Sequence, residues 1–377
     1  MRLKAIVILA AIVALVAWLG WQTRSPTTPA ESLLLDQVLG EAPEQFKMVL
    51  GPEPVSFPSD HAAHPDYRSE WWYFTGNLDG LDGRRFGFQF TLFRFGLETG
   101  PERDSAWQAD ATWMAHLALS DGERQRFYQR ERFARGALGL AGATTERWWL
   151  RDWSVEATEQ GWHLVAHAED FGLELEMALT RPIVLQGEAG FSRKGPERGN
   201  ASRYYSATRL ATRGEVVVDQ TRLPVEGLAW LDREWGSGQL PEAVAGWDWF
   251  ALHLDDGRDL MLYRLRQSDG QASPFSAGVL VGPDGSNRKL AIEDFAAVPR
   301  RWWQGPGGHR WPLQWSVSVP SAGLELSVEP VFDRQLWEGS VRYWEGAMNV
   351  LDATTGTALG RGYLELSGYS EGRMTRQ

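Results

Sequence analysis

The sequence contains no cysteine among its 377 residues. A chain without thiols forms neither a disulfide framework nor a thiolate metal site. It also has no cysteine that could carry the acyl anchor of a bacterial lipoprotein. Any attachment of this chain to a membrane must therefore be made by the peptide itself.

Basic residues are also in short supply, with 38 lysines and arginines against 49 aspartates and glutamates, a net charge of −11. Binding to a phosphate backbone needs clustered positive charge, so we exclude DNA and RNA as partners. The chain has neither a P-loop nor the glycine fingerprint of dinucleotide-binding folds. We therefore expect no cofactor.

Long apolar runs are absent except at the start, where two basic residues precede residues 5–19. A basic end followed by an apolar segment is typical of an export signal. Because Trp18 and Trp21 occupy the place where small residues would mark a cleavage site, we expect residues 1–22 to remain as a signal anchor in the inner membrane. The body would then lie in the periplasm, or be secreted if the signal is cleaved, and residues 23–50 would form a linker.

Tryptophan, in contrast, is abundant, with 20 copies, and apolar residues recur with a period of two. In residues 86–95, Phe86, Phe88 and Phe90 share one face and the intervening residues take the other, which predicts a half-buried strand. The same alternation occurs at residues 173–177, 315–319 and 324–328, and Asp-Gly turn signals separate such runs.

These patterns predict an all-β fold of meandering antiparallel sheets, because no long stripe with a period of 3.6 residues follows residue 39. Closed or nearly closed barrels would hide the many strand edges. Glycines and a proline interrupt the strand pattern at residues 236–246, so we expect one domain at 51–240 and a second at 241–371.

The segment from Trp230 to Trp235 places two acids among indoles. Strand alternation puts Trp230, Asp232 and Glu234 on one face and Arg233 with Trp235 on the other, so the two carboxylates lie about 7 Å apart. On an inner, apolar face at least one acid would have a raised pKa and could donate a proton. On an outer face the same acids would form ion pairs, and both alternatives remain open.

Two other clusters carry polar and aromatic residues. His61 and His64 lie three residues apart in a proline-bounded loop without a defined third ligand, so we predict a hydrogen-bonded loop over a barrel mouth and no metal site. Near the end of the chain, Tyr363 and Glu365 share a strand face opposite Leu364. Either side of that strand could face a barrel lumen.

Five ordered motifs make the sequence recognisable: Phe57-Pro58-x-Asp60-His61-x-x-His64, Glu70-Trp71-Trp72-Tyr73-x-x-Gly76, Ser202-x-Tyr204-Tyr205-Ser206-x-Thr208-Arg209, Trp230-x-Asp232-Arg233-Glu234-Trp235 and Tyr343-Trp344-Glu345-Gly346. Together they resemble the AttH and carotenoid 1,2-hydratase (CrtC-like) lipocalin family, whose members are often labelled predicted secreted hydrolases. The resemblance covers roughly residues 55–370 and implies two lipocalin-like β-barrel domains in tandem.

The resemblance also implies two kinds of activity. In the hydratase branch, an acid protonates an isoprenoid double bond and water captures the cation beside aromatic side chains. Arg233-x-Trp235 stands where that branch has a His-x-Trp element. The AttH-like branch is more similar to this chain, and its association with ABC permeases of the lipoprotein-export or macrolide-export type implies an accessory role in the cell envelope.

We therefore expect an envelope protein that binds an apolar ligand, lipid or isoprenoid-like, as an accessory of an ABC-type export system. The alternative is a hydratase or hydrolase in which Asp232, Glu234 and Glu345 are catalytic and Tyr205 assists. A purely structural subunit of a transporter is the third hypothesis. The expected ligand-binding residues are Glu70, Trp71, Tyr73, Tyr205, Trp230, Trp235 and Tyr343.

Overall fold

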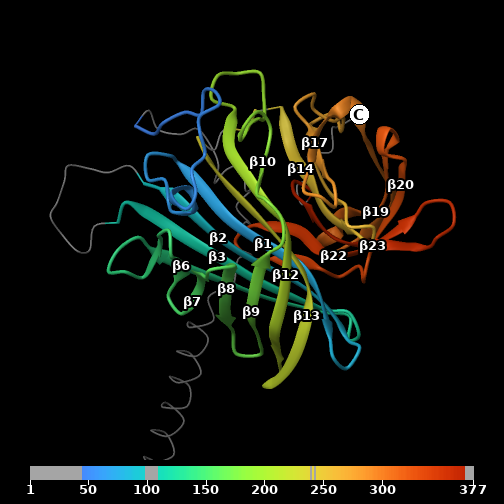
Figure 1. The fold of residues 1–377 in the computed structure, drawn as a ribbon, viewed down its shortest axis with the longest axis horizontal. Coiled ribbons are helices and arrows are strands. Elements are labelled where there is room, and N and C mark those ends of the chain that lie inside the picture. Colours follow the sequence, from blue (N-terminus) through green and yellow to red (C-terminus); the bar gives the residue numbers. More distant parts are fainter. Residues whose placement is uncertain (1–44, 98–108, 238–239, 242, 370–377) are drawn as a thin grey trace, which may run out of the picture.

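The computed structural model describes residues 45–97, 109–237, 240–241 and 243–369 (Figure 1). The predicted all-β fold is confirmed, because two curled antiparallel sheets form a barrel and a half-barrel. No helix in this part of the chain is long and apolar enough to cross a membrane. The predicted signal anchor and most of the predicted linker lie outside the described residues.

The first sheet has the strand order β4-β3-β2-β1-β13-β12-β9-β8-β7-β6-β5, and β10 and β11 pair with β12. Its strands are β1 Ser69–Gly80, β2 Arg85–Gly96, β3 Ala111–Asp121, β4 Arg126–Arg135, β5 Ala141–Ala143, β6 Arg147–Leu150, β7 Trp153–Ala157, β8 Gly161–His167, β9 Phe171–Leu179, β10 Val184–Leu185, β11 Phe191–Arg193, β12 Ala201–Val218 and β13 Thr221–Gly236. Because β1 pairs with β13, the two ends of this segment meet in the middle of the sheet.

The second sheet has the order β17-β16-β15-β14-β23-β22-β20-β19-β18, and β21 pairs with β22. Its strands are β14 Val244–Leu254, β15 Asp259–Gln267, β16 Ala277–Val281, β17 Asn287–Ala291, β18 Ala296–Gln304, β19 Arg310–Val319, β20 Leu324–Pro330, β21 Leu336–Glu338, β22 Arg342–Asp352 and β23 Ala358–Leu366. The described helices are single 3-10 turns, namely η1 Ser59–His61, η2 Ile292–Asp294, η3 Pro306–Gly308 and η4 Pro320–Ala322.

The alternation read from the sequence corresponds to burial in β9. Leu173, Leu175 and Met177 are buried in the core of the first sheet, whereas Glu176 is exposed. One face of this strand therefore packs on the core and the other meets solvent, as expected for an antiparallel sheet.

The prediction of a half-buried strand at residues 86–95 is wrong, because nearly all of β2 is buried. The face opposite its phenylalanines is covered by the second sheet. A Cβ atom on Gly87 would lie 2.5 Å from the Cβ of Ala347 in β22, so only glycine allows this approach. The polar residues of that face, such as Gln89 and Thr91, consequently lie inside the molecule.

The two sheets share a core. One cluster of buried residues combines Tyr73, Tyr204 and Trp230 of the first sheet with residues of the second such as Trp249 and Tyr363. Polar contacts reinforce the interface, and the buried Asp259 carboxylate accepts hydrogen bonds from Arg181, Arg209 and Thr208 of the first sheet's segment. The division into domains at residue 240 stays a prediction, although no strand crosses from one sheet to the other in the described residues.

Candidate active site

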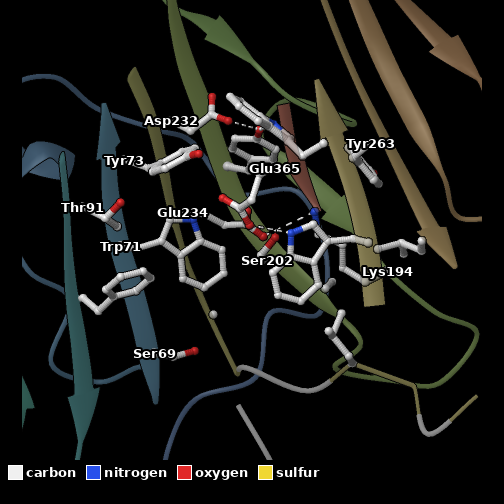
Figure 2. A pocket seen from close by; sticks show the side chains of 18 of the residues that line it. Ser69, Trp71, Tyr73, Thr91, Lys194, Ser202, Asp232, Glu234, Tyr263 and Glu365 are labelled. Atoms are coloured by element: carbon white, nitrogen blue, oxygen red, sulfur yellow. Dashed lines mark hydrogen bonds and ion pairs between the residues drawn. The ribbon is translucent and has the colours of Figure 1, made fainter. Parts of the chain in front are cut away.

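A pocket of about 150 Å³ lies between the two sheets, lined by β1, β2, β12 and β13 on one side and β14, β15, β22 and β23 on the other (Figure 2). Its walls are mostly aromatic and aliphatic, with Trp71, Tyr73, Phe93, Phe95, Tyr204, Leu240, Trp247, Trp249, Tyr263, Leu265 and Tyr343. Three acids and one lysine are set among them: Asp232, Glu234, Glu365 and Lys194. A concave, mostly apolar site with a few convergent polar groups is the usual form of a small-molecule pocket.

Strand β13 supplies two of these acids. Its alternation directs Asp232 and Glu234 to the pocket and Arg233 to the opposite face of the sheet, as the sequence predicted. The pairing register of β13 with its two neighbouring strands places Tyr73 on β1 and Ser206 on β12 directly across from Asp232. Local strand geometry thus assembles the polar part of this wall.

Asp232 is buried and held by three hydrogen bonds. Ser206 Oγ donates to Oδ1 at 2.5 Å, Trp230 Nε1 donates to the same oxygen at 2.7 Å, and Tyr204 donates to Oδ2 at 2.5 Å. Burial raises the pKa of Asp232 to about 7, against these three bonds, which lower it. The carboxyl group therefore populates both its acidic and its basic form near neutral pH.

Glu234 pairs with Lys194, whose Nζ lies 3.4 Å from Oε1. Burial lowers the pKa of Lys194, but Glu234 and the neighbouring Tyr263 and Asp232 raise it above its usual value overall. The ammonium group also lies 4.2 Å from the ring centre of Tyr263 and 5.1 Å from that of Tyr204. The pocket consequently contains a fixed positive charge beside two carboxyl groups.

A second pair of acids meets across β22 and β23, where Glu345 lies opposite Glu365. Tyr73 donates a hydrogen bond to Glu345 Oε2 at 3.3 Å and also interacts with Glu365, which accepts a hydrogen bond from Trp247 at 2.8 Å. Burial raises the pKa of both carboxyl groups, and Glu365 raises that of Glu345 further. Two adjacent buried carboxyl groups cannot both ionise cheaply, so this pair favours the protonated form of at least one of them.

Glu70 lies on the other face of β1 from Trp71 and Tyr73, away from the pocket. Its buried carboxylate accepts hydrogen bonds from Arg233 at 2.5 Å, from Arg94 at 3.2 Å and from the backbone N–H of His64. Burial would raise the pKa of Glu70, but these partners lower it to about 2. This acid is thus an ionised part of a buried network that fixes the loop before β1.

The loop histidines belong to the same face. His61 Nδ1 lies 2.6 Å from the Tyr205 hydroxyl, and the His64 ring stacks on Trp235 with centres 4.1 Å apart. Burial lowers the pKa of His61 to about 4. No group of three or more potential metal ligands occurs among the described residues.

The structure brings together five predicted residues around one pocket, namely Trp71, Tyr73, Asp232, Glu234 and Tyr343. Trp230 lies behind Asp232, and Glu345 reaches the pocket through Tyr73. In contrast, Glu70, Tyr205 and Trp235 lie on the opposite face of the first sheet, in contact with the loop histidines.

Sequence reasoning missed Lys194, Tyr204, Trp249, Tyr263 and Glu365 as pocket residues. Lys194 lies in the connection between β11 and β12, where no periodicity indicates direction. The sequence did place Glu365 on the face of its strand opposite Leu364. Which of the two faces borders the pocket, however, depends on the packing of the second sheet against the first.

The AttH-like family model matches residues 48–369. A crystal structure of an AttH candidate from Nitrosomonas europaea is 34% identical and covers 86% of this chain and 100% of its own, with a TM-score of 0.77. Kievitone hydratase from Nectria haematococca shares the fold, with a TM-score of 0.63 at 14% identity over 88% of this chain and 98% of its own. The dehydratase asqC of Emericella nidulans is 25% identical over 170 residues, 43% of this chain and 47% of the relative, so the chain spans about half of that protein's length.

Proposed function

This chain belongs to the AttH-like family, and from that premise we propose that its inter-sheet pocket binds an apolar small molecule and adds water to it or removes water from it. The observation that carries the proposal is Asp232, a buried carboxyl group with a pKa of about 7 in the wall of an aromatic pocket. A carboxyl group with such a pKa can donate a proton and take one back near neutral pH.

The reaction would follow the chemistry of acid-catalysed hydration. The Asp232 proton forms a bond to one carbon of a double bond, the oxygen of a water molecule forms a bond to the other carbon, and a pocket base accepts the remaining water proton. Removal of water is the same sequence in reverse. The ring faces of Trp71, Trp249 and Tyr263 would stabilise positive charge that develops on the substrate.

The dehydratase among the relatives supports this reaction class, and the likeness to kievitone hydratase supports the fold alone. A second candidate function is binding without reaction. It is favoured by the three hydrogen bonds to Asp232, which also suit a static network. The apolar ligand is common to both candidates, and turnover separates them.

We expect an apolar compound to copurify with the protein after gentle extraction and to be visible by native mass spectrometry. The variant Ser202→Phe would fill the pocket, because the Ser202 hydroxyl lines it and has no hydrogen-bond partner among the described residues. This variant should lose the bound compound. Thr221→Phe, at an exposed position of β13, should retain it.

Turnover is then measured with the recovered compound in water labelled with heavy oxygen. If the native protein catalyses incorporation of heavy oxygen into the compound, the result supports a hydratase or dehydratase. A compound that stays bound for many hours without incorporation supports the binding candidate instead. If Ser202→Phe retains the compound as well as the native protein does, the pocket is not its site.

The signal anchor, the position of the body outside the cytoplasm and an ABC permease as partner stay predictions from the sequence and the family resemblance. We expect an alkaline phosphatase fusion after Thr28 to be active, because the enzyme folds only outside the cytoplasm, and the mature protein to keep its first 22 residues. An inactive fusion contradicts export. A mature N-terminus near Thr23 contradicts only the anchor.

A further inference from the structure

The pocket residue Tyr343 contacts His116 of the first sheet, which in turn contacts Glu131. Its hydroxyl lies 2.6 Å from His116 Nδ1, and His116 Nε2 lies 3.0 Å from Glu131 Oε1. A phenol that lines the pocket, an imidazole and a carboxylate therefore stand in a row. A reactive group, a base and a group that orients the base are the recurrent parts of proton-transfer sites.

The fold fixes this row tightly. His116 on β3 and Glu131 on β4 are direct cross-strand neighbours, and Tyr343 comes from β22 of the second sheet. The indole of Trp337 stacks on the imidazole with ring centres 4.1 Å apart. Ser340 binds Glu131 through its backbone N–H and, at 2.6 Å, through its hydroxyl.

These contacts determine the tautomer of His116. Glu131 accepts hydrogen bonds from Ser340 and, as an ionised acceptor, also accepts one from His116 Nε2–H. The His116, Ser340 and backbone contacts lower the pKa of Glu131, although burial opposes them. His116 Nδ1 is then unprotonated and accepts the hydrogen bond from Tyr343.

The charge states of the two residues allow a proton to move from Tyr343 to His116. Burial lowers the pKa of His116, against the opposing effect of Glu131, so the ring is neutral at pH 7 and its free nitrogen can accept a proton. Burial raises the pKa of Tyr343 well above its usual value, and the nearby carboxyl groups of Glu345, Glu365 and Glu131 raise it further. Tyr343 therefore does not ionise alone, but it can take up one proton while it passes its own to His116.

We propose that Tyr343 is the catalytic base of the pocket and that His116 and Glu131 are positioning residues that receive and stabilise its proton. This inference rests on the proposed function. As the water oxygen bonds to the substrate, one water proton moves to the Tyr343 oxygen and the Tyr343 proton moves to His116 Nδ1. The imidazolium ion is paired with Glu131, and Asp232 has given its proton to the substrate.

After the product leaves, His116 loses its extra proton to solvent and Asp232 takes up a proton from solvent. Glu131 offers the exit, because 17% of its side chain is exposed whereas His116 is fully buried. The row thus lets an apolar pocket dispose of a proton without opening to bulk water. The experiment that tests this role measures proton transfer itself.

The probe is 2-naphthol, an apolar aromatic alcohol that becomes a strong acid when excited by light. Bound in the native pocket, it should transfer its proton and emit as naphtholate. In Tyr343→Phe, the naphtholate share of the bound probe's emission should fall by about a hundredfold, the lower end of the contribution of a positioned acid–base group. Fluorescence anisotropy gives the occupancy, so that emission is compared at equal binding.

Two further variants complete the experiment. His116→Asn should reproduce the loss while keeping Tyr343, and it also serves if Tyr343→Phe folds poorly. Tyr363→Phe removes another buried hydroxyl of the same interface, which has no partner among the described residues, and should keep native emission. If the probe binds and emits equally in the native protein, in Tyr343→Phe and in His116→Asn, Tyr343 is not the base. If the native protein shows no saturable binding of the probe, both the pocket and the proposed function are overturned.

Discussion

Glu70→Gln is expected to lower the free energy of unfolding at pH 7 by about 3–5 kcal/mol, the usual cost of removing one partner from a buried ion pair. The substitution leaves the shape almost unchanged but removes the negative charge opposite Arg233, which is fully buried and 2.5 Å from the Glu70 carboxylate. Arg94 loses its carboxylate partner as well and keeps its hydrogen bonds to backbone oxygens. Urea unfolding followed by circular dichroism measures the change.

The contribution of Glu70 to the free energy of unfolding should decrease at low pH. The pKa of Glu70 is lowered from 4.5 to about 2, so its contribution to stability is complete above pH 4.5 and is lost as the pH falls through 2. The difference between native protein and Glu70→Gln should therefore shrink over that range. Glu176→Gln is the matched control, because Glu176 makes an exposed, solvent-screened ion pair with Arg213, and its loss should change the free energy of unfolding far less than Glu70→Gln does. Equal effects of the two substitutions would contradict the buried network.

Asp232→Asn is expected to do the opposite and to stabilise the protein at alkaline pH while abolishing turnover. Burial raises the pKa of Asp232 from 3.8 to about 7, so the unfolded chain gives up this proton more easily than the folded one. The folded state therefore loses stability as the pH rises from 3.8 to 7, by up to about 4 kcal/mol at 1.36 kcal/mol per pKa unit. Asparagine has no proton to lose and avoids this cost.

Thermal and urea unfolding at several pH values test this prediction. Asp232→Asn should exceed the native stability at pH 8 and match it near pH 4. The asparagine amide can accept from Ser206 and Trp230 and donate to the Tyr204 oxygen, so the hydrogen bonds survive. Glu234→Gln, in the same pocket, should instead destabilise, because it leaves the ammonium group of Lys194 without its carboxylate. A less stable Asp232→Asn at pH 8 would mean that an ionised Asp232 supports the fold, and the acid role would fail.

The two predictions concern acids on neighbouring strands, and they differ because alternate residues face different surroundings. Applied strictly, the period of two would have separated Glu70 from Trp71 and Tyr73, and Tyr205 from Tyr204. The sequence motifs suggest one shared site instead, because they place these residues next to one another along the chain. The structure places Trp71, Tyr73 and Tyr204 at the pocket, whereas Glu70 and Tyr205 lie on the opposite face, where Glu70 binds Arg233.

The sequence by itself determined the all-β class and the face of β13 that carries Asp232 and Glu234, because strand periodicity is a local property of the backbone. Only the tertiary structure decided what those faces meet. The packing of the second sheet against the first buried both sides of β2 and brought Glu365 and Tyr343 to the pocket, and the connection between β11 and β12 placed Lys194 beside Glu234. These contacts join residues far apart in the chain, and their energy depends on desolvation and on the fit of two curved sheets, which no local pattern encodes.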